Sequence, residues 1–182
     1  MPRDIDTQNV IILCIDFQEK LLPYIFDFEK IVKNAIIMIK AAKILQVPII
    51  VTEQYPKGIG RTVKPVADAL GEYQPVEKVH FSCFQEEDFT SKLQKLGREN
   101  LIIMGIESHV CIYQTTREAI NAGYHAYILE DAMSSRVREN HEIAVRRMIS
   151  EGAIPSSVEM TIFELLKKAG TPEFREILKI VK

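Results

Sequence analysis

Uninterrupted apolar runs are the clearest pattern in the chain, and they do not alternate with polar residues. Four of them are rich in β-branched side chains: VIILCI (10–15), VPIIVT (47–52), NLIIMGI (100–106) and HAYILEDA (125–132). Runs of this kind are typical of parallel strands that are covered on both faces. They predict four strands of a mostly parallel sheet, and shorter strands are predicted near 75–81 and 153–158.

Apolar residues recur at helical spacing in the segments between these runs. In 28–45, the recurring residues are Ile31, Ala35, Met38, Ala42 and Leu45. Helices are also predicted at 87–96, 109–122 and 140–151, and a glycine follows the first two of these in the position of a helix C-cap. The tail from Thr161 predicts two helices, separated by the sequence GTP (170–172).

The alternation of strands and helices sets the fold class. It predicts right-handed crossovers and an α/β fold, a three-layer α/β/α sandwich around a mostly parallel, Rossmann-like central sheet. The 182 residues are enough for one domain with a substantial core, so a single domain is predicted over 1–182. In such sheets ligands bind beyond the carboxyl ends of the strands.

Composition and charge exclude several partners. With 47% hydrophobic and 26% charged residues the chain is an ordinary globular protein, and its net charge of −2 gives no basic surface for nucleic acid. No apolar run approaches the roughly 18 residues of a membrane helix. The first residues have no basic head or cleavage region of a signal peptide, so we expect a cytoplasmic protein without nucleic-acid or membrane partners.

Three cysteines, Cys14, Cys83 and Cys111, are an odd number without CxxC spacing. This argues against a disulfide framework and a thiolate zinc site, so we expect free thiols. Cys14 and Cys83 are expected to be structural. Cys111 falls in the first turn of the helix predicted after 100–106, where the helix dipole lowers a thiol pKa and backbone amides can bind an oxyanion. From its position alone, a buried apolar filler is nevertheless the commoner role.

Polar residues cluster at the predicted carboxyl ends of the strands. They are Asp16; Glu53, Gln54 and Tyr55; Lys78 and His80; Glu107, Ser108, His109 and Cys111; and Glu130 and Asp131. A carboxylate, an ammonium group and a thiol could therefore meet in one crevice. Each also has a simpler role taken singly, because a carboxylate that ends a strand often fixes a loop and a lysine is usually on the surface.

Five segments, in order, carry a family resemblance: LCIDFQEKL (13–21), VPIIVTEQYPKGIG (47–60), EKVHFSCF (77–84), GIESHVCIYQTT (105–116) and LEDAMSSR (129–136). Through them the chain resembles the isochorismatase-like cysteine hydrolases, which include nicotinamidases and carbamoyl-amide hydrolases. VTEQYPKGIGRTV and the closing TPEFREILKIVK are most similar to the branch of small isochorismatase domain-containing proteins.

The resemblance implies a catalytic triad of Asp16, Lys78 and Cys111. In that family the cysteine attacks a carbonyl carbon, the aspartate moves the thiol proton to the leaving group, and the lysine holds both groups electrostatically, until water hydrolyses the thioester. A cis peptide bond is implied at Ile106–Glu107. It would direct the amides of Val110 and Cys111 into an oxyanion hole.

One departure from the family narrows the chemistry. Nicotinamidases carry an Asp-x-His metal motif after the second strand, where this chain has TEQYPKG. We therefore expect no catalytic metal and no cofactor, and we disfavour nicotinamide as the substrate. The branch that cleaves the vinyl ether of isochorismate can lack the cysteine, so Cys111 favours acyl chemistry.

The sequence thus predicts a cysteine-dependent hydrolase that acts on a small amide, carbamoyl compound or ester through a thioester on Cys111. Expected pocket walls are Phe17, Gln18, Gln54, Tyr55, Phe84 and His109. The resemblance also implies a homo-oligomer. The alternative is a non-catalytic binding or scaffold protein that retains the fold. A redox-sensing thiol lacks an obvious resolving partner, and nucleotide binding at GIG (58–60) lacks the longer glycine fingerprint.

Overall fold

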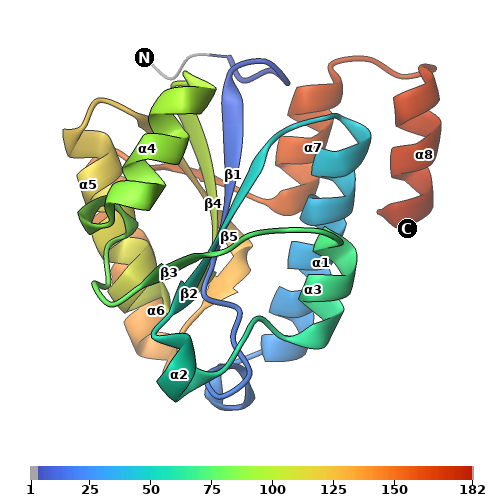
Figure 1. The fold of residues 1–182 in the computed structure, drawn as a ribbon. Coiled ribbons are helices and arrows are strands. Elements are labelled where there is room, and N and C mark those ends of the chain that lie inside the picture. The colour runs from blue at the N-terminus through green and yellow to red at the C-terminus, as the bar shows by residue number, and fades with distance from the viewer. Residues whose placement is uncertain (1–3, 182) are drawn as a thin grey trace.

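The computed structural model, which describes residues 4–181, is a three-layer α/β/α sandwich (Figure 1). Its sheet has six strands in the order β3-β2-β1-β4-β5-β6, and every neighbouring pair is parallel. The strands are β1 (Val10–Ile15), β2 (Ile49–Gln54), β3 (Val76–Lys78), β4 (Asn100–Ile106), β5 (His125–Ser134) and β6 (Ile154–Ser156). The predicted α/β class and the parallel sheet are confirmed.

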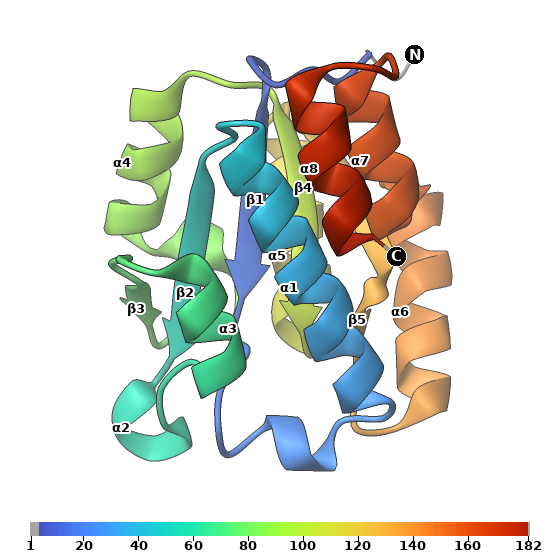
Figure 2. The ribbon, with the colours of Figure 1, turned by 90° about the vertical axis from the view of Figure 1, so that its right-hand side faces the viewer.

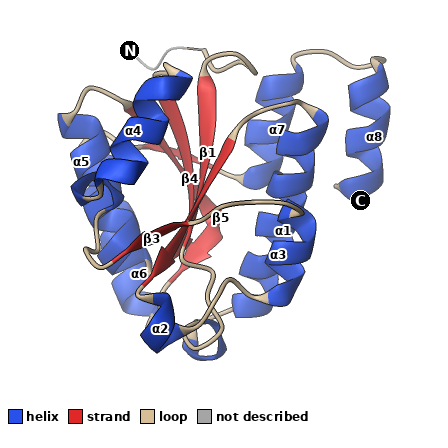
Figure 3. Cartoon of the chain, in the orientation of Figure 1, coloured by secondary structure: helices blue, strands red, loops and turns tan. Residues whose placement is uncertain are grey.

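Helices cover both faces of the sheet (Figure 3). One layer contains α1 (Phe28–Ile44), α3 (Lys64–Leu70), α7 (Val158–Leu166) and α8 (Pro172–Ile180). The other contains α4 (Glu87–Leu96), α5 (Tyr113–Asn121) and α6 (Arg138–Ser150). Figure 2 shows α1 crossing the first face with α3 and α8 on either side of it. The short helix α2 (Pro56–Ile59) lies at the carboxyl edge of the sheet.

The central strand β1 explains the uninterrupted apolar pattern. All six of its residues are buried, and successive side chains enter opposite cores. Ile11, Leu13 and Ile15 pack under α4, α5 and α6, while Ile12 and Cys14 pack under α1. Because both faces of the strand are covered, neither set of alternate positions needs to be polar.

Several element boundaries differ from those expected. β5 continues to Ser134 with a register shift opposite β4, so Glu130 and Asp131 lie within the strand and not at its end. The Asp131 carboxylate accepts the Val158 N–H at 2.9 Å, at the start of α7. That helix begins three residues before Thr161 because Ser157 caps it. Two short helices, α2 and α3, each begin with a proline in the first turn and were not predicted.

Gly105 fixes the close approach of β1 and β4 beside the site. It pairs with Ile15 in the sheet register, and its φ of +141° is one that residues with a side chain rarely adopt. A Cβ atom at this position would collide with the Ile15 carbonyl oxygen. Glycine therefore lets the strand that precedes Cys111 lie directly against the strand that ends in Asp16.

Candidate active site

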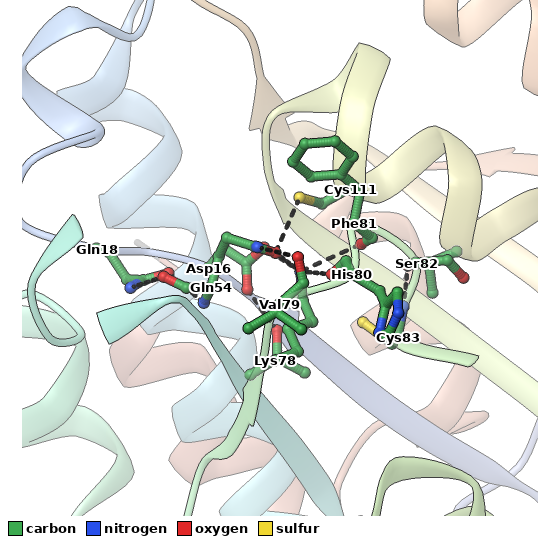
Figure 4. Close-up of polar contacts among 12 residues, drawn as sticks. Asp16, Gln18, Gln54, Lys78, Val79, His80, Phe81, Ser82, Cys83 and Cys111 are labelled. Atoms are coloured by element: carbon green, nitrogen blue, oxygen red, sulfur yellow. Dashed lines mark hydrogen bonds and ion pairs between the residues drawn. The ribbon is translucent and has the colours of Figure 1, made fainter. Parts of the chain in front are cut away.

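Three adjacent strands deliver a buried polar cluster to the carboxyl edge of the sheet (Figure 4). Asp16 follows β1, Gln54 ends β2 and Lys78 ends β3. The Lys78 ammonium lies 2.8 Å from Asp16 Oδ2 and donates to Gln54 Oε1 at 2.6 Å. The other Asp16 oxygen, Oδ1, accepts from the Thr52 hydroxyl at 2.7 Å. Both charged side chains are fully shielded from solvent, so their pairing offsets the cost of burying them.

Lys78 is held further by the loop that follows β3. Its ammonium donates to the carbonyl oxygen of Phe81 at 3.1 Å and, more weakly, to that of His80 at 3.4 Å. Glu86 fixes this loop, because its carboxylate accepts the N–H groups of Val79 and His80 at 3.0 and 3.2 Å. The ammonium therefore occupies a site whose acceptors are set by backbone geometry.

Cys111 lies in a π-helical turn, Ser108–Ile112, that runs directly into α5. Its sulfur is 4.0 Å from Gln54 Oε1, and the residue is only 6% exposed. The structure thus brings together Asp16, Lys78 and Cys111, the three residues of the triad implied by the resemblance.

The electrostatics of the thiol differ from the sequence expectation. Burial raises the pKa of Cys111, and the charge of Asp16 and a hydrogen bond with it raise the pKa further, while Lys78 acts to lower it. The start of a helix was expected to lower this pKa, but the cost of burying a thiolate outweighs that effect. Burial also acts to lower the pKa of Lys78, but attraction to Asp16, and to Cys111 and Cys83 at the high pH where they ionise, raises it overall. The resting cluster is therefore a thiol beside an ion pair.

The buried thiols make stability depend on alkaline pH. Burial raises the pKa of Cys14 and Cys111, and it raises that of Cys83 to about 12. Each thiol therefore binds its proton more tightly when folded. This stability is fully present below the ordinary thiol pKa of about 8.5 and is lost above it, at up to about 1.4 kcal/mol per pH unit for each thiol. Urea unfolding at about pH 8 and about pH 10 should give the lower free energy at the higher pH.

Cys14→Ala is the matched variant for this measurement, because it removes one buried thiol from the far side of β1. Its free energy of unfolding should fall less steeply with pH than that of the wild type. The raised pKa of Lys78 acts in the same direction at still higher pH, since its contribution is lost as pH rises through the folded value. Equal unfolding free energies at the two pH values would contradict the prediction.

The turn that carries Cys111 is organised around Glu107. The Ile106–Glu107 peptide bond is cis, as the resemblance implied. The Glu107 carbonyl oxygen accepts the N–H groups of Val110 at 3.0 Å and Ile112 at 3.2 Å. The Val110 amide is therefore engaged within the turn, and this corrects the expectation that it is available to an oxyanion.

Three of the expected pocket walls have packing or hydrogen-bonding partners within the protein. Gln18 is fully buried, and its side-chain amide is bonded to the backbone of Gln54 and Gly60. Phe17 is equally buried, in the core beneath α1. The Phe84 ring packs on Phe89 and Tyr124 at centroid distances of 5.3 and 5.8 Å. The expected place of Phe17 and Gln18 in the crevice is corrected, because both side chains are enclosed in the interior. Phe84 is only partly buried, so its role as a wall stays a prediction.

Gln54, a fourth expected wall, is buried within the polar cluster, and the remaining two are nearer the surface. His109 is partly buried and bonds through Nδ1 to the Ser135 hydroxyl at 2.9 Å. Tyr55 is exposed and has a positive φ. Sequence reasoning missed Phe81, which is 51% exposed and whose ring projects toward Cys111 in Figure 4. A single aromatic residue in a loop gives no periodic signal, so only its place after Lys78 could have indicated it.

The residues that replace a metal motif after β2 have other partners. The buried Glu53 carboxylate accepts from the N–H and hydroxyl of Thr62 and from Arg61, each at 2.8 Å. Gln54 accepts from Lys78. Among residues 4–181 no group of three or more His, Cys, Asp or Glu side chains is arranged to hold a metal ion. In the same part of the chain, no helix has the length and apolar character needed to cross a membrane.

Comparison with known proteins shows which family and fold the chain resembles. The family model described as the isochorismatase domain matches residues 10–160. Mouse isochorismatase domain-containing protein 2A is 38% identical over 184 residues, which cover 99% of this chain and 85% of the mouse protein. A Caenorhabditis elegans structure described as MAR1 ribonuclease is 36% identical, with a TM-score of 0.92 over 98% of this chain and 92% of that one. The ycaC product of Escherichia coli, described as an octameric hydrolase of unknown specificity, shares the fold at 22% identity and a TM-score of 0.88, over 100% of this chain and 89% of that one.

Proposed function

The chain belongs to the isochorismatase family, and from that premise we propose that it is a cysteine-dependent hydrolase of a small amide, carbamoyl compound or ester. The observation that carries the proposal is the buried Asp16–Lys78 ion pair, 2.8 Å long, beside the thiol of Cys111. A nucleophile within reach of a carboxylate base, which a third group orients, is the arrangement that covalent acyl transfer requires.

In the proposed reaction Cys111 Sγ attacks the carbonyl carbon of the substrate while Asp16 accepts the thiol proton. The carbonyl electron pair moves onto oxygen, and the amide N–H of Cys111 stabilises this oxyanion. When the bond to the leaving group breaks, Asp16 returns the proton to that group and a thioester remains on Cys111. Water then attacks the thioester, gives a proton to Asp16, and the sulfur regains a proton as the acid departs.

Lys78 and Gln54 support this proton transfer without reacting. The ammonium pairs with the Asp16 carboxylate and offsets the negative charge that develops on sulfur, as its lowering effect on the pKa of Cys111 indicates. Gln54 Oε1 accepts from Lys78 at 2.6 Å and lies 4.0 Å from the sulfur, so it orients the ammonium toward Cys111.

A small substrate suits the enclosed thiol. Cys111 is buried, and Phe81, Tyr55 and His109 are the residues that we propose as walls around it. Tyr24, Val79, Phe81 and Tyr55 leave large apolar side chains exposed. We propose a homo-oligomer for this chain, as the family resemblance implies, in which some of these side chains would be covered by a neighbouring subunit.

An activated ester tests the proposal directly. When p-nitrophenyl acetate is mixed with the protein and the reaction is quenched with acid, peptide mass spectrometry should find one acetyl group on Cys111. Cys14 and Cys83, which are buried and have no carboxylate base bonded to the sulfur, should carry none. Acetylation spread evenly over lysines, without a Cys111 adduct, would contradict the proposed mechanism and favour the binding or scaffold alternative.

A second candidate comes from the Caenorhabditis elegans neighbour, whose description names a ribonuclease. For this chain the candidate is hydrolysis of RNA. The net charge of −2 offers no general attraction for a polyanion. Incubation of the wild type and of Cys111→Ala with a labelled RNA decides between the two candidates. RNA cleavage by the wild type that is lost in Cys111→Ala would show that the substrate is a nucleic acid and not a small acyl compound.

A further inference from the structure

Glu107 links the two sides of Cys111 to a distant segment of the chain. Its carbonyl oxygen binds the amides of Val110 and Ile112, the neighbours of Cys111 on either side. Its carboxylate accepts the backbone N–H of Arg136 at 2.9 Å and the Arg136 Nε–H at 3.1 Å. Glu107 thus fixes the turn Ser108–Ile112, here called the nucleophile turn, through its carbonyl oxygen. Its own position is fixed by the contacts of its carboxylate with Arg136.

Burial makes the side-chain contact a strong one. The Glu107 side chain is 9% exposed, whereas that of Arg136 is 59% exposed. Arg136 Nε–H is the charged one of the two donors, and its loss would leave the buried carboxylate with the neutral backbone N–H alone. The Glu107 side chain is therefore expected to move toward solvent when Arg136 Nε–H is absent, and the carbonyl group that anchors the turn would move with it.

Two further contacts join the same parts of the molecule. The Ser108 hydroxyl bonds to His141 Nδ1 at 2.9 Å, and His109 bonds to Ser135. Three consecutive residues at the start of the nucleophile turn are therefore each fixed by the segment that follows β5. Among these contacts only the one at Glu107 continues, through its carbonyl, to both neighbours of Cys111.

We propose that Arg136 is a positioning residue for Cys111 and acts through Glu107, an inference that rests on the proposed cysteine hydrolase function. Arg136 touches neither the sulfur nor the Asp16–Lys78 pair. Its effect is to keep the Cys111 thiol within reach of the Asp16 carboxylate. Displacement of a reacting group by about 1 Å can cost about a hundredfold in rate.

The test replaces Arg136 with alanine and with lysine and measures two rates. Arg136→Ala should lower kcat for p-nitrophenyl acetate by about 10- to 100-fold with little change in KM, because substrate binding is not altered. Alkylation of Cys111 by iodoacetamide should become faster by about threefold or more, because the thiol moves away from Asp16, which raises its pKa, and toward solvent. Arg136→Lys, which keeps a cation near Glu107, should lie between the wild type and the alanine variant.

Two controls separate positioning from a general loss of structure. Arg138→Ala removes a similar ion pair of 3.0 Å, to Glu142 on the exposed face of α6, and should leave both rates unchanged. Glu107→Gln should slow hydrolysis as Arg136→Ala does. The double variant Arg136→Ala/Glu107→Gln should be no slower than the slower single variant, since the two residues act in series.

The outcomes are decisive in each case. Slower hydrolysis with faster alkylation, and non-additive effects of the two substitutions, support the inference. Unchanged rates in Arg136→Ala, or fully additive losses, overturn it. If the wild type shows no Cys111-dependent hydrolysis, the proposed function fails, and the alkylation rate alone then decides whether Arg136 positions the thiol.

Discussion

Cys111→Ala should abolish turnover of p-nitrophenyl acetate and of any acyl substrate found for the protein. The sulfur is the only atom in the cluster that can form the thioester, so the loss in kcat should be at least about a thousandfold. The measurement is release of p-nitrophenolate by the purified variant, together with its thermal unfolding. The unfolding temperature should change little, because the variant loses only one buried sulfur atom and the backbone hydrogen bonds of the turn remain.

Cys14→Ala is the matched control for that experiment. It removes the same atom from a residue that is as deeply buried but faces the core beneath α1. This variant should keep the wild-type rate. A Cys111→Ala protein that still hydrolyses the ester at a rate comparable to wild type would exclude Cys111 as the nucleophile.

Asp16→Asn should produce a loss of similar size and, in addition, a clear loss of stability. The amide cannot accept the thiol proton, so kcat should fall by about a thousandfold. Lys78 would remain buried without its counter-charge, and breaking a buried pair in this way costs about 3–5 kcal/mol. The rate is measured with p-nitrophenyl acetate and the stability by urea unfolding at neutral pH.

The same substitution should make the Cys111 thiol easier to ionise, so hydrolysis should become slower while thiolate formation moves to lower pH. Asp16 raises the pKa of Cys111 through its charge and its hydrogen bond, while Lys78 lowers it. Removal of the carboxylate therefore shifts the midpoint of the pH dependence of Cys111 alkylation to lower pH. A midpoint that stays or rises would contradict the proposed contact between Asp16 and the thiol.

Asp131→Asn is the control for both readouts. Its carboxylate is partly buried and accepts a backbone N–H, but it lies within β5 and has no contact with the cluster. The variant should keep the wild-type hydrolysis rate and the wild-type pH dependence of alkylation. Any loss of stability it shows reflects the start of α7 and not the site.

The sequence was informative where a residue's place at the end of a strand determines its environment. Asp16, Lys78 and Cys111 follow apolar runs, and the carboxyl ends of parallel strands meet at one edge, so their convergence followed from pattern and resemblance together. The same reasoning placed Glu130 and Asp131 at the end of a strand, and this was wrong because β5 continues past them. The apolar run gave no sign of where that strand would stop.

Properties that depend on burial and on contacts between distant segments were not predicted. The position of Cys111 at the start of a helix indicated a lowered pKa, but its depth in the core reversed the sign. Gln18 was predicted to line the site as a polar residue, but its side-chain amide is fully hydrogen-bonded to the backbone of Gln54 and Gly60. Arg136 ends the segment LEDAMSSR, which gave it no role of its own, and only the path of the chain after β5 brings it to Glu107.

Gly105 has a consequence for how this protein can vary. The backbone angle and the nearby Ile15 carbonyl leave no room for any side chain, so the position tolerates a single residue type whatever substrate the protein acts on. In a library of random variants, position 105 should remain glycine even under selection for folding alone. Phe81 and Tyr55, two of the proposed walls, are exposed, so they should accept other residues under selection for a new substrate while position 105 does not.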